Sequence, residues 1–143
     1  MSASFTIKPE HNLVISLASG ILTFGDIAEH RRRLLGDPKF SSRFNQLIDF
    51  SAVTSIQIGS GQIEQLAREH LFSRESRRAL LVNSQLHFGL CRMFATYSDL
   101  AGESKVVVLK EFHQAIAWLD VPETVVHAAL AELRAQTEDA RGK

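Results

Sequence analysis

The chain has 143 residues, of which 45% are hydrophobic and 22% are charged, as in an ordinary globular domain. Its 16 Lys and Arg residues balance 16 Asp and Glu residues, so the formal net charge is zero with neutral histidines. Nucleic-acid-binding proteins usually carry an excess of basic residues, because contacts with phosphates supply much of their affinity. The composition therefore argues against nucleic acid as a partner.

The N-terminal part of the chain predicts a β-hairpin followed by a helix. Apolar residues alternate with other residues in the segments 5–7 and 13–17, and the polar residues between them favour a turn. Gly20 is expected to end the hairpin. Thr23, with Asp26 three residues later, resembles a capping box, so a helix is expected to begin there and to end at a Gly-Asp-Pro sequence.

Hydrophobic periodicity in the middle of the chain predicts two strands and two helices. The segments 47–50 and 79–82 are short and apolar, as buried strands are. Ser60 is expected to cap a helix. The residues expected on the inner face of that helix follow at helical spacing: Ile63, Leu66, Ala67, His70 and Leu71. The segment 86–97 shows a second helical stripe.

The last part of the chain predicts one more strand and two helices. Three valines and a leucine at 106–109 favour a buried strand, because β-branched side chains suit a sheet. The segment 112–119 has the spacing of a short helix. Pro122 suits the first turn of a final helix, with Asp120 as its expected cap and a frayed polar tail beyond Gln136.

A hairpin followed by alternating helices and strands predicts an α/β fold, in which helices cover a mostly parallel sheet. Five short sequences in this order stand out: Gly20-Ile21-Leu22-Thr23, Asp37-Pro38-Lys39-Phe40, Leu47-Ile48-Asp49-Phe50, Gly89-Leu90-Cys91-Arg92-Met93-Phe94 and Glu111-Phe112-His113-Gln114-Ala115-Ile116-Ala117-Trp118-Leu119. Together they resemble the SpoIIAA-like group of the STAS domains, which are mostly uncharacterised bacterial proteins. The resemblance implies a SpoIIAA-like domain at 1–120, with a mixed sheet that starts with the hairpin, and a C-terminal helical extension at 121–143.

The best-understood STAS proteins are anti-sigma-factor antagonists, which are switched at a serine in an Asp-Ser-Ser-Gly sequence at a helix start. Only Ser60 and Gly61 match that sequence here, with one residue inserted; Gly59 precedes them, and Gln57 or Ile58 replaces the acidic residue. A helix N-terminus presents unpaired N–H groups. The segment Gly59-Ser60-Gly61 is therefore a candidate phosphorylation switch or anion site, and a plain N-cap role for Ser60 is the alternative.

No residue pattern typical of an enzyme or a metal site is present. The six histidines lack metal-ligand spacing, and no Cys-x-x-Cys or Gly-x-Ser-x-Gly sequence occurs. Cys91 is either a nucleophile activated by Arg92 or a small buried residue. We therefore expect no enzyme, no metal and no cofactor, and His70 is expected to be a hydrogen-bonded core residue.

Cysteine usage and the absence of targeting signals predict the cellular location. One cysteine forms no internal disulfide, which suits a reducing compartment. The segment 1–8 lacks the basic start and apolar core of a signal peptide, and no apolar run approaches the ~20 residues of a membrane-spanning helix. We therefore expect a cytoplasmic protein without a membrane span.

Two basic clusters and one tryptophan are candidates for contacts with other molecules. The clusters 31–33 and Arg74, Arg77 and Arg78 are expected to be solvated faces, with docking of an acidic partner or a lipid headgroup as the alternative. Trp118 lies off the apolar face of its predicted helix. Because exposed tryptophans often anchor interfaces, Trp118 is a candidate interface residue, with a core position as the alternative.

We expect a non-enzymatic regulatory or protein-interaction module of the STAS type, as the resemblance implies. The loop 54–61 and the helix after it would form the recognition surface for a protein partner, with Ser60 as the switch. A homodimer would be built on the sheet edge or the C-terminal helix. The alternative is a binding domain for a small apolar ligand or lipid, with a pocket in the aromatic-rich C-terminal half.

Overall fold

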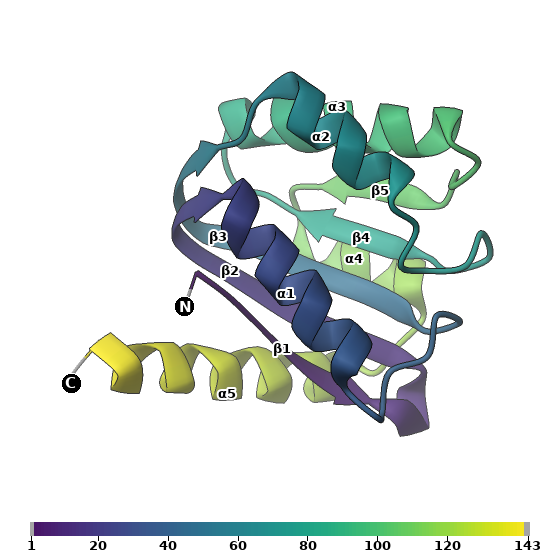
Figure 1. The fold of residues 1–143 in the computed structure, drawn as a ribbon. Coiled ribbons are helices and arrows are strands. Elements are labelled where there is room, and N and C mark those ends of the chain that lie inside the picture. Colours follow the sequence, from purple (N-terminus) through teal and green to yellow (C-terminus); the bar gives the residue numbers. More distant parts are fainter. Residues whose placement is uncertain (1, 142–143) are drawn as a thin grey trace.

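Five strands form one sheet in the order β1-β2-β3-β4-β5, in which β1 pairs antiparallel with β2 and the other pairs are parallel. The computed structural model describes residues 2–141. The strands are β1 (Ala3–Lys8), β2 (Leu13–Thr23), β3 (Asn45–Gln57), β4 (Arg78–Leu81) and β5 (Val106–Leu109). The helices are a short 3-10 turn (Pro9–His11), α1 (Phe24–Gly36), α2 (Ser60–Arg68), α3 (Gln85–Leu100), α4 (Phe112–Leu119) and α5 (Glu123–Arg141). The predicted hairpin and mostly parallel sheet are confirmed (Figure 1).

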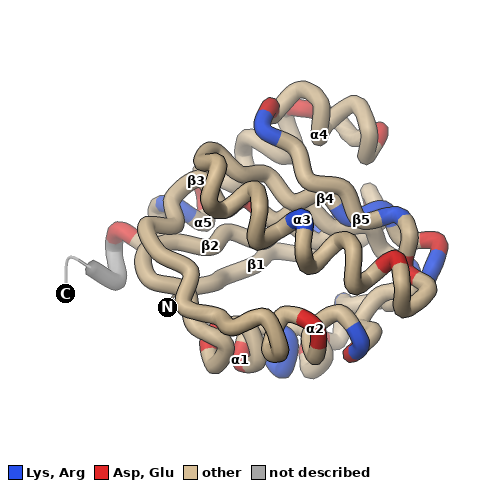
Figure 2. The backbone as a smooth tube through the Cα atoms, turned by 90° about the horizontal axis from the view of Figure 1, so that it is seen from above, with Lys and Arg blue, Asp and Glu red and all other residues tan. Residues whose placement is uncertain are grey.

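Helices cover both faces of this sheet. Helices α1, α2 and α3 lie over one face and α4 and α5 over the other, and in Figure 2 α1 and α2 lie on the opposite side of the sheet from α4. Side chains of a strand alternate between the two faces. Along β2, Leu13, Ile15 and Leu17 point towards α4 and α5, while Val14 and Ser16 point towards α1. The strand is therefore buried on both sides.

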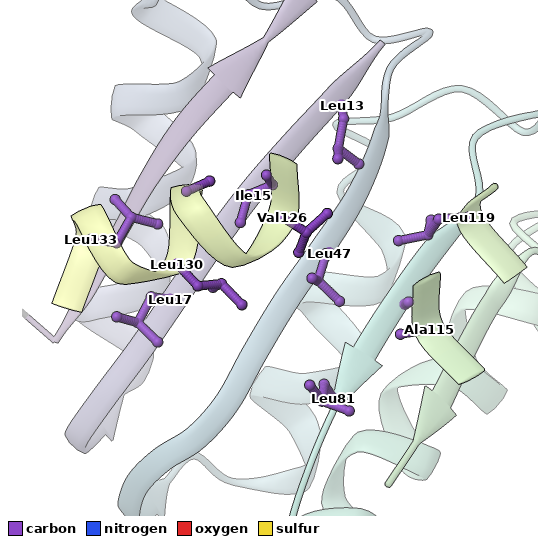
Figure 3. Close-up of a cluster of buried hydrophobic side chains, with 12 residues drawn as sticks. Leu13, Ile15, Leu17, Leu47, Leu81, Ala115, Leu119, Val126, Leu130 and Leu133 are labelled. Atoms are coloured by element: carbon purple, nitrogen blue, oxygen red, sulfur yellow. The ribbon is translucent and has the colours of Figure 1, made fainter. Parts of the chain in front are cut away.

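The face under α4 and α5 holds the largest hydrophobic core. In Figure 3 the side chains of α5 lie against β2. The labelled residues come from β2 (Leu13, Ile15, Leu17), β3 (Leu47), β4 (Leu81), α4 (Ala115, Leu119) and α5 (Val126, Leu130, Leu133). Helix α5 continues past Gln136, where the sequence predicted a frayed tail, and ends at Arg141.

Strands β2 and β3 are both longer than the sequence predicted. Gly20 does not end β2: it has a φ of 66° and lies beside a shift of register in the pairing with β3, after which β2 continues to Thr23. Glycine adopts a positive φ at little cost, and such an irregularity bends a strand without ending it. β3 likewise continues to Gln57, so the segment 54–57, predicted as loop, belongs to the strand, and its residues 55–57 pair with the end of β2.

Local signals predicted the start of α1 correctly but the end of α2 incorrectly. The Thr23 amide donates to Asp26 Oδ2 at 2.9 Å and the Asp26 amide donates to Thr23 Oγ1 at 3.2 Å, which is the expected capping box. Helix α2 ends at Arg68 and does not reach Leu71. After it the chain turns, so that Leu71 packs in the small hydrophobic cluster that contains Leu34 of α1. Tertiary packing therefore overrides the local helical pattern.

Candidate functional site

A cavity of about 100 Å³ lies between the sheet and helices α1, α2 and α3. Protein interiors are normally packed as closely as organic crystals, and one water molecule needs only ~10–15 Å³ of such space. The wall is mostly apolar, and its side chains include Ile48, Phe50, Ile63, Leu66, Leu80 and Phe94. The cavity draws on both halves of the chain, whereas the sequence suggested a pocket in the aromatic-rich C-terminal half.

A chain of buried polar side chains borders this cavity. His30 Nε2 on α1 lies 3.0 Å from Ser16 Oγ, which accepts a hydrogen bond of 3.2 Å from Gln46 Nε2. Arg78 Nε donates to Gln46 Oε1 at 3.1 Å, and Arg78 Nη1 donates to Glu103 Oε1, also at 3.1 Å. Each of these five residues is at most 8% exposed. The hydrogen bonds replace the water that each polar group loses on burial.

Burial and neighbouring charges set the protonation of these groups. Burial lowers the pKa of His30 to about 4, with further lowering by Arg33, Arg31 and Arg78, so its imidazole is neutral at neutral pH. Burial also lowers the pKa of Arg78, while the charge of Glu103 acts in the opposite direction. Burial, and then the charge of Arg78, lower the pKa of Arg31 to about 10, which leaves it protonated. Two guanidinium charges therefore lie near one buried carboxylate.

Arg31 and Arg78 correct the prediction that both basic clusters are solvated. The Arg31 side chain is 13% exposed and that of Arg78 is 5% exposed. Arg31 follows Ile27 by four residues on the inner face of α1, and Arg78 lies two residues before Leu80 on the same face of β4. These spacings are the signal in the sequence that could have located both arginines. Arg32 is exposed, as predicted, and pairs with a glutamate of its own helix.

Two further side chains surround the pair formed by Arg78 and Glu103. The guanidinium carbon of Arg78 lies 4.6 Å from the centre of the Phe72 ring, within the range of a cation–π contact. His70 Nδ1 lies 3.2 Å from Glu103 Oε2. The His70 side chain is 43% exposed and follows the end of α2, so its expected hydrogen bond is present but its expected core position is wrong.

Cys91 lies on α3 in the wall of the cavity and is 5% exposed. Burial raises the pKa of its thiol to about 12, so the reactive thiolate is scarce at neutral pH. Arg92, which would have to activate it in the nucleophile alternative, is exposed. The prediction of a small buried residue is confirmed, and the alternative of an activated nucleophile is wrong.

The segment 59–61 lies at the start of α2 and is exposed. Gly59, and not Ser60, is the N-cap: its amide donates to Gln62 Oε1 at 3.0 Å, and Ser60 is the first residue of the helix. Among the described residues, the Ser60 hydroxyl makes no hydrogen bond. Ile63, one turn further along α2, lines the cavity. The proposed switch residue is thus exposed and one helical turn from the cavity wall.

Trp118 lies on α4, on the face of the sheet opposite the cavity. Its side chain is half-buried against the core under α4 and α5. Arg77 Nη1 donates to the Trp118 carbonyl at 2.8 Å, and its guanidinium carbon lies 5.6 Å from the centre of the indole ring. Part of the ring remains accessible, and its role as an interface residue stays a prediction.

Within the described part of the chain, no three His, Cys, Asp or Glu side chains are grouped as a metal site would require. A search of the same residues finds no helix with the length and apolar character needed to cross a membrane. Figure 2 shows Lys and Arg residues interspersed with Asp and Glu residues along the backbone.

Comparison with known proteins identifies the fold. No protein-family model matches the sequence, and no curated protein does. The structure is similar to the crystal structure of an uncharacterised protein of the DUF3478 family from Shewanella loihica PV-4, which is described as having a SpoIIAA-like fold. The TM-score is 0.54, the sequence identity is 15%, and the match covers 82% of this chain and 94% of that one. The chain therefore has a SpoIIAA-like fold, as the sequence predicted.

Proposed function

We propose that the protein is a non-enzymatic binding module that holds one small, largely apolar molecule in the cavity under α1, α2 and α3. The observation that carries this proposal is the cavity itself, with about 100 Å³ of space, a mostly apolar wall and a single polar patch. Ligand sites in proteins usually combine an apolar wall with a few convergent polar groups. Binding of a small apolar ligand, which the sequence analysis gave as the alternative function, is therefore the function that we propose first.

The energetics of an unfilled cavity favour a ligand. Side chains that face unfilled space lack the van der Waals contacts that close packing gives elsewhere in the interior. A ligand that fills it restores contacts to the surrounding side chains and buries its own apolar surface, at ~25 cal/mol per Å². Binding should therefore stabilise the folded protein, and more so for ligands that fill the space better.

The ionisable groups of the wall favour binding over catalysis. Cys91 is held as a thiol, and the neutral His30 is already bonded to Ser16. Glu103 does not line the cavity, and its carboxylate is engaged by Arg78. A general acid or base must exchange a proton with a substrate at hydrogen-bonding distance, and groups committed to neighbouring side chains are poorly placed for this.

A protein-interaction role is the second candidate, with α2 as the recognition surface. It is supported by the exposure of Ser60 one turn from Ile63, because a ligand that displaces Ile63 would also change the surface around Ser60. A phosphate on Ser60 would lie at a helix N-terminus, where unpaired N–H groups favour negative charge. Native mass spectra of protein from its own organism should show a phosphate increment on Ser60 and report any homodimer. Unmodified Ser60 in cells from every growth phase would contradict the switch.

Methyl NMR with 1-hexanol as a neutral probe tests the ligand-binding role. Saturable shifts are expected for Ile63 and Leu66 in the cavity wall but not for Leu133 in the core of the opposite face. An Ile63→Phe substitution fills the space and should abolish these shifts. Leu35→Phe, a change of similar size at a residue 63% exposed on α1, is the matched control and should leave them intact. Shifts that never saturate, or that spread equally over both faces, would contradict the proposal.

A further inference from the structure

We infer that the molecule held in this cavity is a short-chain amphiphile with a carboxylate head, which Arg31 and Arg78 bind while the hydrocarbon chain fills the apolar part. This rests on the proposed function and adds the chemical class of the ligand. It is carried by two guanidinium groups, the buried one of Arg78 and the largely buried one of Arg31, in the wall of an otherwise hydrophobic cavity.

The polar groups of the wall form one patch. The polar residues that line the cavity are His30, Arg31, Gln46 and Arg78. Gln46 bonds directly to Arg78, and His30 is joined to Gln46 through Ser16. Arg31 lines the same cavity as Arg78. The other lining side chains are hydrophobic, so a molecule with one polar end and one apolar end matches the wall.

This patch carries more positive than negative charge. Arg78 is buried and the Arg31 side chain is only 13% exposed, and Glu103 is the single buried carboxylate beside them. Glu69 has its carboxylate 4.0 Å from Arg31, but its side chain is 54% exposed, so water screens the pair. His30 is neutral at neutral pH because burial lowers its pKa to about 4. A singly charged anion in the cavity would balance the remaining charge.

Both guanidinium groups also keep unused N–H donors. Arg31 Nη1 donates to the Glu69 carbonyl at 2.9 Å, while its Nε and Nη2 make no hydrogen bond among the described residues. Arg78 uses Nε and Nη1, and its Nη2 has no hydrogen-bond partner in the same part of the chain. A carboxylate offers two acceptor oxygens in a plane, which matches the planar fork of a guanidinium. An ammonium head would be repelled by both arginines.

The size of the cavity limits the length of the chain that it can bury. Its volume of about 100 Å³ is smaller than the ~150 Å³ of an engineered apolar cavity that accepts benzene. Because the cavity is also partly open to solvent, a chain of a few carbon atoms is the best match, and it need not be enclosed along its whole length. Hexanoate is a suitable probe, since hexanamide has nearly the same shape without the charge and hexylamine carries the opposite charge.

Calorimetric titration of the whole protein with these three probes at neutral pH tests the head group. Hydrogen bonds to charged groups contribute ~1.5–3 kcal/mol each, so hexanoate should bind roughly tenfold to a hundredfold more tightly than hexanamide. Hexylamine should not bind. This comparison uses the unchanged protein, so it does not depend on how a variant folds.

A pair of neighbouring arginines on α1 supplies the matched variants. Arg31→Met should weaken hexanoate binding about tenfold or more and leave hexanamide binding unchanged, because only the charged head loses its partner. Arg32→Met removes the same charge from a side chain that is 72% exposed and should leave both affinities unchanged.

Two results would overturn the inference in distinguishable ways. Equal affinities for hexanoate and hexanamide, with Arg31→Met affecting neither or both alike, would exclude a carboxylate head but leave an apolar binding site in place. Failure of hexanoate, hexanamide and 1-hexanol to bind at all would overturn the inference together with the proposed function.

Discussion

Arg134 Nη2 on α5 lies 2.9 Å from Asp49 Oδ2 on β3, which joins two residues 85 positions apart in the sequence. The Asp49 side chain is 2% exposed, and its Oδ1 accepts a second hydrogen bond of 2.8 Å from the Ser51 amide. The Arg134 side chain is 49% exposed, so the pair lies at the edge of the core. Because a buried carboxylate is costly without partners, this contact helps to set where α5 crosses the sheet.

Replacing Arg134 with Met should lower the free energy of unfolding by about 1–2 kcal/mol, because the Asp49 carboxylate then keeps only one of its two hydrogen bonds. The half-exposed position of Arg134 keeps the effect below that of a fully buried pair. Urea denaturation, followed by the fluorescence of the single tryptophan, Trp118, measures the change. Gln136→Met, an exposed change on the same helix, should alter stability by less than ~0.5 kcal/mol. Equal stabilities of the two variants would mean that Asp49 does not need Arg134.

Leu130 gives a direct measure of how far α5 contributes to the core. It is 2% exposed and packs with β2 and α4 residues in the largest hydrophobic cluster. Leu130→Ala should lower the free energy of unfolding by about 2–5 kcal/mol through lost burial and the space left behind. Leu35→Ala, at a position 63% exposed, is the control, with an expected change within ~0.5 kcal/mol. If the unfolding curves of the two variants coincide, the packing of α5 on the sheet does not contribute to stability.

The fold could be predicted because the burial of a segment determines which residue types occur in it. The segments 79–82 and 106–109 lie in central or helix-covered strands, so almost every side chain in them is hydrophobic. The capping residues Thr23 and Asp26 likewise act on the nearest turn of backbone. Where the prediction was wrong, distant contacts decide: the pairing of β2 with β3 carries both strands past the residues that suggested their ends.

The cavity could not be predicted in the same way, because its polar groups meet only through the tertiary fold. Arg78 and Glu103 are 25 positions apart, and Ser16 and Gln46 are 30 positions apart. Each of these residues would be assigned to solvent by its type alone. Arginine is the clearest case: the side chain of Arg31 is 13% exposed and that of Arg32 is 72% exposed on the same turn of α1, and only the position of the helix against the sheet separates them.

His30 predicts a loss of stability at mildly acidic pH. Its pKa is about 4 in the folded protein against an ordinary value of 6.5, chiefly because it is buried. Below pH 6.5 the unfolded chain therefore binds a proton that the folded protein does not, so stability falls as the pH drops from about 6.5 towards about 4. Between pH 7 and pH 5 this residue should account for about 2 kcal/mol of the loss.

The substitution His30→Gln isolates this contribution. Gln cannot be protonated but can still hydrogen-bond to Ser16, so the variant should be less sensitive to pH between 7 and 5 than the unchanged protein. Urea denaturation at several pH values measures the difference. His127→Gln is the control, because His127 is exposed on α5 and its removal should change the pH profile much less than the removal of His30 does. Profiles that run parallel for His30→Gln and the unchanged protein would show that His30 is not held neutral.

Cys91 should react with N-ethylmaleimide far more slowly than an exposed thiol. Burial raises its pKa from 9.0 to about 12, which lowers the thiolate fraction at pH 8 by roughly a thousandfold, and the cavity wall further limits access. The double variant Cys91→Ala/Ser60→Cys provides an exposed thiol at the start of α2 as the reference. Mass spectrometry follows both reactions, and urea should bring Cys91 to the reference rate.

Bound 1-hexanol should slow the reaction of Cys91 further without affecting the reference thiol. If Cys91 in the folded protein instead reacts at the reference rate, α3 does not close the cavity against water, and a ligand there would have to bind in an open groove.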